Sequence, residues 1–148
     1  QDRHLGKIIW SSQSLPADWK MRAELWGRKN YIEQYPETTQ LLADATVRAM
    51  NWISQHQDEF QQSQTKFGQP LTVIQRESQN SASTWQQDWS PEYQVDFLKQ
   101  HYAKVIDHAV KNQLIQTPLK ADELLNSKFA DQAIQNLHAN DQQNKQGD

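Results

Sequence analysis

Two long segments of the chain carry apolar residues at the three- and four-residue spacing of an amphipathic helix. The first begins at Pro36 and Glu37, residue types that suit a first helical turn, and we expect it to run to about His56. The second begins at Ser90 and Pro91, a capping residue followed by a proline at the first helical position. On the first helix, the positions expected to face the core are Leu41, Leu42, Ala45, Ala49, Met50 and Ile53.

An apolar cluster near the N-terminus has a different pattern. Residues 5–10 read Leu-Gly-Lys-Ile-Ile-Trp and are followed by two serines. β-branched residues beside a tryptophan, ended by turn-forming serines, favour a short strand. A strand that ends in two hydroxyls can direct O–H and backbone N–H groups at a small ligand. Trp10, Ser11 and Ser12 are therefore candidate ligand-binding residues, with a simple capped turn as the alternative explanation of the same spacing.

The remaining segments are shorter or ambiguous. A helix from Trp19 through Ile32 is interrupted or weakened at Gly27, because glycine costs about 1 kcal/mol relative to alanine inside a helix. Residues 71–74 are ambiguous, because their residue types favour a strand but their length does not exclude a helical turn. The other expectations are a short polar helix at 58–66, a loop at 79–88 anchored by Trp85 and Trp89, and a last helical segment ending near Leu137.

Two expectations concern where helical and ordered structure ends. Asn112 is expected to take the left-handed conformation that closes the second long helix, because asparagine tolerates it. Residues 141–148 have nothing to bury and predict a disordered tail. The ordered part is therefore expected to span residues 1–140.

Composition narrows the class of protein. The chain has 148 residues, and 23 Gln and 8 Asn make about a fifth of it neutral amide. The hydrophobic fraction is 36%, so the core is expected to be thin, and fourteen aromatic residues partly compensate. The net charge is −3 with no basic stripe, which argues against a nucleic-acid partner. The chain has no cysteine, which excludes disulfides, thiolate catalysis and cysteine-ligated metals.

The chain carries no recognisable catalytic or metal-binding motif. Its five histidines include no His-Glu-x-x-His pattern, and its serines include no Gly-x-Ser-x-Gly elbow. His101 and His108 lie seven residues apart, whereas two ligands of one metal ion on the same helix typically lie four residues apart. We therefore expect no catalytic residue, no metal, no cofactor and no enzyme activity.

The order of these segments resembles the C-terminal part of a periplasmic solute-binding protein of the nitrate/sulfonate/taurine ABC importer family. The resemblance runs over residues 5–137 and depends on four segments in the right order. Those segments are 5–12, similar to a strand near the hinge; 28–37, similar to a helix ending in Pro-Glu; 41–53, where small residues precede an aromatic; and 96–115, which in the family ends in Gly-Leu-Ile. Here Asn112 and Gln113 stand in place of that glycine.

The resemblance implies an α/β fold: a mostly helical C-terminal portion of a type II periplasmic-binding-protein fold with a short hinge-proximal strand. Family members hold a small anionic solute, such as an aliphatic sulfonate, taurine or nitrate, between two lobes and dock on ABC permease subunits. By this resemblance Trp10, Ser11 and Ser12 would lie near the cleft, with Trp19 as an aromatic wall. The chain would then be part of a periplasmic protein, and its truncated form could associate with itself.

Two other functions are compatible with the sequence. The helices that begin at Pro36 and Pro91 suffice for a helical protein-interaction module without a small-molecule pocket. An enzyme is a weaker alternative, because the same lobe architecture occurs in a group of thiamine-precursor synthases. The position of residues 5–12 distinguishes the solute-binding protein from the interaction module. A strand buried in a sheet at these residues favours the solute-binding protein.

Overall fold

The described part of the chain is all-helical. The computed structural model describes residue 9 and residues 24–79, 84–117 and 119–145. Helix makes up 79% of the described residues, which contain no strand. The expected α/β class is therefore wrong. It depended on the family resemblance and on a strand at residues 5–10, of which only Ile9 is described, and that residue is 94% exposed and outside any strand.

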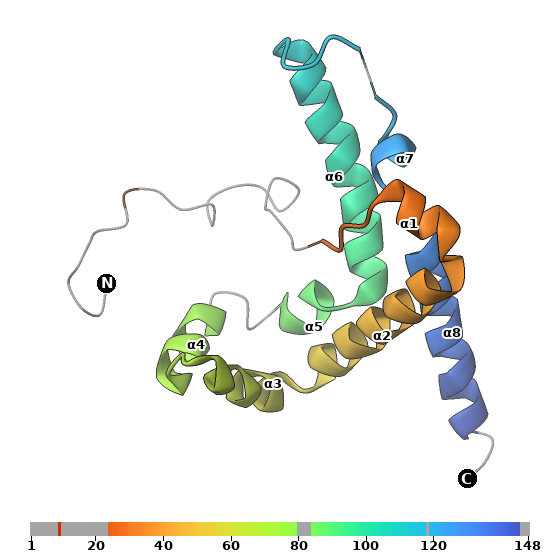
Figure 1. Ribbon diagram of the computed structural model, residues 1–148. Helices are drawn as coiled ribbons and strands as arrows, with labels where there is room; N and C mark the ends of the chain where they lie inside the picture. Colours follow the sequence, from red (N-terminus) through yellow and green to blue (C-terminus); the bar gives the residue numbers. More distant parts are fainter. Residues whose placement is uncertain (1–8, 10–23, 80–83, 118, 146–148) are drawn as a thin grey trace.

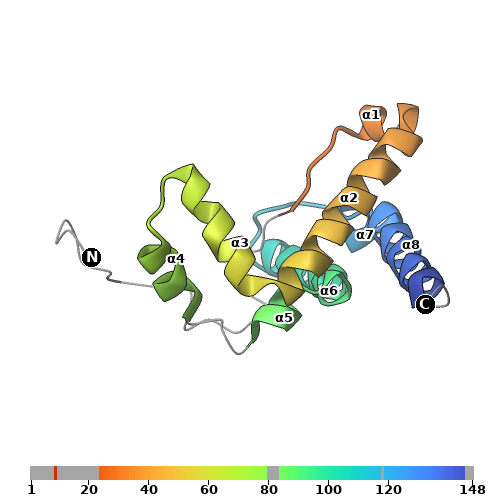
Figure 2. The same cartoon turned by 90° about the horizontal axis from the view of Figure 1, so that it is seen from below.

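Most helices follow one another with short connections, and a longer one, residues 112–120, joins α6 to α7 (Figure 1). In chain order they are α1 (Lys29–Gln34), α2 (Pro36–Gln55), α3 (Gln57–Gln64), the 3₁₀ turn η3 (Thr65–Phe67), α4 (Leu71–Ser78), α5 (Trp85–Asp88), α6 (Pro91–Lys111), α7 (Ala121–Leu124) and α8 (Lys128–Lys145). Helices α2, α6 and α8 form the centre, and α3 and α4 make a helical hairpin beyond the C-terminal end of α2. Seen from below, α8 lies along one side of α2 (Figure 2).

The main hydrophobic contact joins α2 to α8. Val47 of α2 and two α8 residues, Ala133 and Leu137, are buried together, with Ala43 and Ile134 packed against them. Ala133 is only 1% exposed, and its small side chain lets the two helices approach closely. This cluster is small, as the low apolar fraction of the sequence predicts.

A polar seam runs beside that cluster. The amide of Gln40 donates to Asp44 Oδ1 and to the carbonyl oxygen of Phe129, both at 3.0 Å. Asn136 Nδ2 donates to the same Asp44 oxygen at 3.1 Å. These bonds satisfy half-buried polar groups that would otherwise weaken the contact, so amide side chains help to fix how α8 lies on α2.

A second cluster is aromatic and fixes the C-terminal end of α2. The rings of Phe60, Trp85 and Trp89 lie with their centroids 5.3–5.9 Å apart in tilted or edge arrangements, which aromatic pairs prefer. Trp85 is buried, and its indole N–H donates to the carbonyl oxygen of Ile53 at 2.9 Å. Trp85 therefore anchors the segment as predicted, although the expected loop contains the short helix α5.

The local start signals of the long helices are confirmed. Pro36 and Pro91 both occupy the first turn, and Ser90 Oγ accepts a hydrogen bond from the backbone N–H of Tyr93. The short polar helix is confirmed as α3, and the ambiguous segment at 71–74 begins helix α4, in which Ile74 is buried. Residues 24–28 are not helical, so no helix passes through Gly27, and helix α1 begins at Lys29.

The end of α6 differs from the expectation by one residue. Asn112 has a φ of −95°, and Gln113 takes the left-handed conformation with a φ of 57°. The N–H of Leu114 donates to the carbonyl of Ala109 and the N–H of Gln113 to that of Val110, which is the Schellman arrangement. That arrangement places the left-handed residue one position after the cap. At the other end of the fold, α8 continues to Lys145, and the domain boundary at 140 stays a prediction.

Candidate functional site

The four residues predicted to bind a ligand lie outside the described residues. Trp10, Ser11, Ser12 and Trp19 therefore stay predictions, and the structure neither brings them together nor separates them. The candidate sites below come from the described residues alone.

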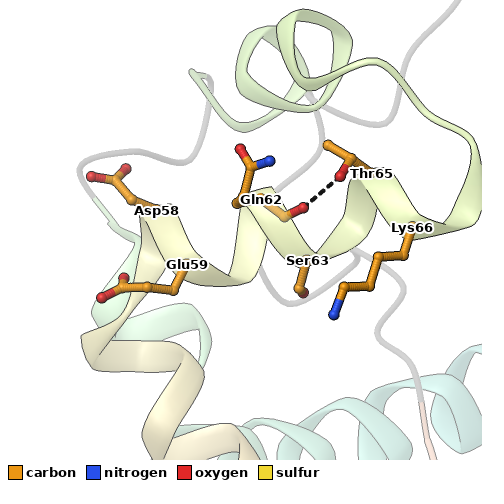
Figure 3. Close-up of a pocket in the computed structure, with 6 residues that line it drawn as sticks. All are labelled: Asp58, Glu59, Gln62, Ser63, Thr65 and Lys66. Carbon is orange, nitrogen blue, oxygen red and sulfur yellow. Dashed lines mark hydrogen bonds between the residues drawn. The ribbon is translucent and has the colours of Figure 1, made fainter.

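A shallow hollow lies over α3 and η3 and has a volume of about 550 Å³. It is lined by Asp58, Glu59, Gln62, Ser63, Thr65 and Lys66. Figure 3 shows that these side chains leave the helix on two opposite sides, so they do not converge on one point. Both hydroxyls donate to backbone carbonyls of the previous turn, Ser63 to Phe60 and Thr65 to Gln62, each at 2.7 Å. The hollow therefore offers neither an activated nucleophile nor a convergent set of polar groups.

A serine, a carboxylate and a histidine meet where α6 begins. Ser90 Oγ donates to Glu92 Oε2 at 2.8 Å, and His138 Nε2 lies 3.0 Å from Glu92 Oε1. In a hydrolytic triad the histidine lies between the serine and the acid, because it takes the proton of the serine. Here the carboxylate lies in the middle, and Ser90 also caps α6. The three side chains join α6 to α8 and do not form a nucleophilic site.

The charge of Glu92 is stabilised in this arrangement. Partial burial acts to raise the pKa of Glu92, but hydrogen bonds from its own backbone N–H, from Ser90 and from His138 outweigh that effect. The pKa of Glu92 therefore lies below its ordinary value of 4.5. This carboxylate also lies in the first turn of α6, where the helix dipole favours a negative charge.

Tyr102 of α6 holds the segment that precedes α1. Its hydroxyl donates to Glu24 Oε2 at 2.7 Å, across 78 positions of sequence. Partial burial, the hydrogen bond and the negative charge of Glu24 together raise the pKa of Tyr102 to about 12. A tyrosine with a raised pKa is a poor proton donor near neutral pH, so this contact is structural.

The largest unexplained feature is an apolar stripe on the outer side of α2. Its members recur at three- and four-residue spacing and all are exposed: Leu41, Leu42, Ala45, Ala49 and Trp52. Leu41 is 69% exposed, Leu42 51% and Trp52 45%. The Trp52 ring stacks on the ring of His56 with centroids 4.6 Å apart, and His56 Nδ1 lies 2.7 Å from the carbonyl oxygen of Trp52. The indole is thus held in place at one end of the stripe.

The prediction that this stripe faces the core is wrong for Leu41, Leu42, Ala45 and Ala49, which are all exposed. The core side of α2 is the opposite one, where Val47 is buried against α8. Apolar residues occur on both sides of α2, and periodicity alone does not say which side has a partner. The structure distinguishes the two sides through polar contacts, since Gln40 and Asp44 lie on the side of Val47 and form hydrogen bonds with α8.

The described residues hold no group of three or more His, Asp or Glu side chains that could bind a metal ion. No helix in the described ranges is both long and apolar enough to cross a membrane. Comparison of the chain with protein-family models, with curated proteins and with solved structures gives no match.

Proposed function

We propose that this chain is a helical protein-interaction module that binds its partner through the apolar stripe of α2. The observation that carries the proposal is the exposure of Leu41, Leu42 and Trp52 on one side of a helix whose opposite side already supplies the core. Scattered exposed apolar side chains are ordinary on protein surfaces, whereas a contiguous patch is typical of an interaction site.

The chemistry of the stripe supports a protein partner over a small solute. Covering exposed apolar surface is favourable by roughly 25 cal/mol per Å², and this gain needs a partner surface of matching shape. Small solutes are held instead in concave sites with convergent polar groups. The stripe lies on the convex side of a helix, and two alanines at its centre leave room for another backbone to approach.

The solute-binding function, with its ABC permease partners and periplasmic location, depends on the sequence resemblance alone. Its mechanism needs two lobes built around sheets, and the described residues form helices only. Calorimetric titration of the chain with taurine, alkanesulfonates and nitrate separates the two hypotheses. The interaction module predicts no heat of binding, and a saturable heat with any of the three would favour the solute-binding protein.

Site-specific photocross-linking tests the proposed surface in living cells. A benzophenone amino acid replaces Leu42 in the stripe, and a matched control carries it at Phe67, which is 81% exposed and lies on η3. We expect covalent protein adducts from position 42 that disappear when Leu41→Asp is added, and none from position 67. Equal adducts from both positions, or adducts that survive Leu41→Asp, would contradict a role for the stripe.

A further inference from the structure

Four of the five stripe residues of α2 are placed symmetrically about Val47, and the mirror position of the fifth, Leu41, is the half-buried Ile53. Counted outward from Val47 in both directions, Ala45 mirrors Ala49 and Leu42 lies at the same distance as Trp52. An interface between two identical subunits related by a two-fold axis must match itself in this way, with each residue facing its mirror position. We infer that the partner is a second copy of this chain, whose α2 packs antiparallel on the first with the axis passing at the level of Val47. The inference rests on the proposed role of the stripe.

Side-chain sizes fit this arrangement. The two alanines of each helix meet at the centre, where small side chains allow helix axes to come within about 8 Å of one another. Farther out, Leu42 of one copy meets Trp52 of the other on each side of the axis. The stacking of Trp52 on His56 fixes the indole before binding, so little side-chain freedom is lost when the partner arrives.

The stripe is also uncharged, which lets it face a copy of itself. Its five residues carry no charge, and the neighbouring exposed cation, Arg48, lies at its edge. A partner of opposite charge has no feature to recognise within the stripe. Self-association brings no like charges together along its centre.

The area predicts a weak dimer. Leu41, Leu42 and Trp52, with the alanines between them, expose on the order of 350 Å² of mainly apolar surface. A stable interface needs about 800 Å² from each partner. The stripe falls short of that area, so we expect only a weak, reversible dimer with a dissociation constant on the order of 100 µM.

Sedimentation equilibrium of the purified full chain from about 5 to 500 µM tests the self-association. We expect the mass to rise from 17.3 kDa toward twice that value. Leu42→Asp should weaken dimerisation at least about tenfold, while Leu114→Asp, at a leucine that is 70% exposed and lies after α6, should leave it unchanged. Circular dichroism of both variants checks that they keep the helical fold.

Engineered cysteines test the antiparallel register. The chain has no cysteine of its own, so Ala45→Cys and Ala49→Cys each provide a single thiol. A disulfide needs Cα atoms about 4.4–6.8 Å apart. An antiparallel pair predicts that an oxidised mixture of the two variants cross-links faster than either variant alone. A parallel pair predicts the reverse, with each variant cross-linking best to itself, and would overturn the proposed geometry.

Different results would overturn the proposal that the stripe is an interaction surface and the inference that its partner is a second copy. A chain that stays monomeric at 500 µM overturns the second-copy inference, whatever happens in cells. If position 42 then still gives adducts with another protein, the stripe remains an interaction surface for a different partner. If the chain is monomeric and position 42 gives no adduct, both proposals are wrong.

Discussion

Trp85 offers a sharp test of how the small domain is held together. It is 9% exposed, packs against Phe60 and Trp89, and donates its indole N–H to the carbonyl oxygen of Ile53. Trp85→Ala removes the packing and the hydrogen bond together. Substitutions of this kind in a core cost about 3–5 kcal/mol, a large part of the stability of a domain this size.

A second variant separates the two contributions. Trp85→Phe keeps an aromatic ring but deletes the N–H donor, which is worth about 0.5–1.5 kcal/mol. The Ile53 carbonyl also accepts from the backbone N–H of His56 at 3.3 Å, so it is not left unpaired. We therefore expect a loss of about 1 kcal/mol from the hydrogen bond, plus a smaller packing loss from the reduced ring.

The matched control is Trp52, which is 45% exposed and lies on the outer side of α2. Trp52→Ala should cost less than about 1 kcal/mol, because surface substitutions rarely exceed that value. Urea unfolding followed by circular dichroism at a few micromolar protein gives all three free energies of unfolding from one assay. The reasoning is refuted if Trp85→Ala costs no more than Trp52→Ala, or if Trp85→Phe costs as much as Trp85→Ala.

Three further substitutions test individual polar groups. Because its pKa is lowered, the ionised Glu92 carboxylate stabilises the fold above pH 4.5, and this stability is lost as the pH falls through the lowered pKa. Glu92→Gln should therefore destabilise the fold at about pH 6 and less at about pH 3. A destabilisation that is no smaller at the lower pH would contradict this. Tyr102 has its pKa raised from 10.0 to about 12, so the stability it contributes is present below pH 10 and lost toward pH 12. In ultraviolet titration, Tyr102→Phe should remove the tyrosine that ionises near 12, and loss of one that ionises near 10 would be contrary evidence. Gln61 is 4% exposed, and its side chain makes no hydrogen bond with a described residue. Gln61→Met should therefore raise the free energy of unfolding by about 1–3 kcal/mol in chemical denaturation. A free energy of unfolding below that of the wild type would mean that the amide has a partner.

The predictions that succeeded depend on local physical chemistry. Pro36, Ser90 and Pro91 act within one helical turn, through a missing N–H, a fixed φ and a side chain that accepts a hydrogen bond. Such effects do not depend on distant contacts, and the starts of α2 and α6 followed from them. The anchoring role of Trp85 could also be predicted, because a large apolar ring within a polar stretch is expected to pack against the rest of the fold.

The predictions that failed depend on contacts between distant segments. For residues 71–74 the sequence left a strand and a helical turn open, and they form the start of helix α4, in which Ile74 is buried. The side of α2 that faces the core was assigned wrongly because both sides carry apolar residues, and only the pairing of Asp44 with Asn136 of α8 distinguishes them. The exposed stripe, which carries the functional proposal, is therefore the feature that the sequence pattern misassigned.

The orientation of α2 is the claim on which the rest depends, and one pair of variants measures it. Val47 is 4% exposed and Leu42 is 51% exposed. An unpaired charge is costly to bury, so Val47→Asp should abolish the cooperative thermal unfolding transition, followed by circular dichroism at a few micromolar protein. Leu42→Asp should leave the midpoint of that transition within a few degrees of the wild-type value. The opposite result, with Leu42→Asp unfolded and Val47→Asp intact, would place the stripe in the core and contradict the account.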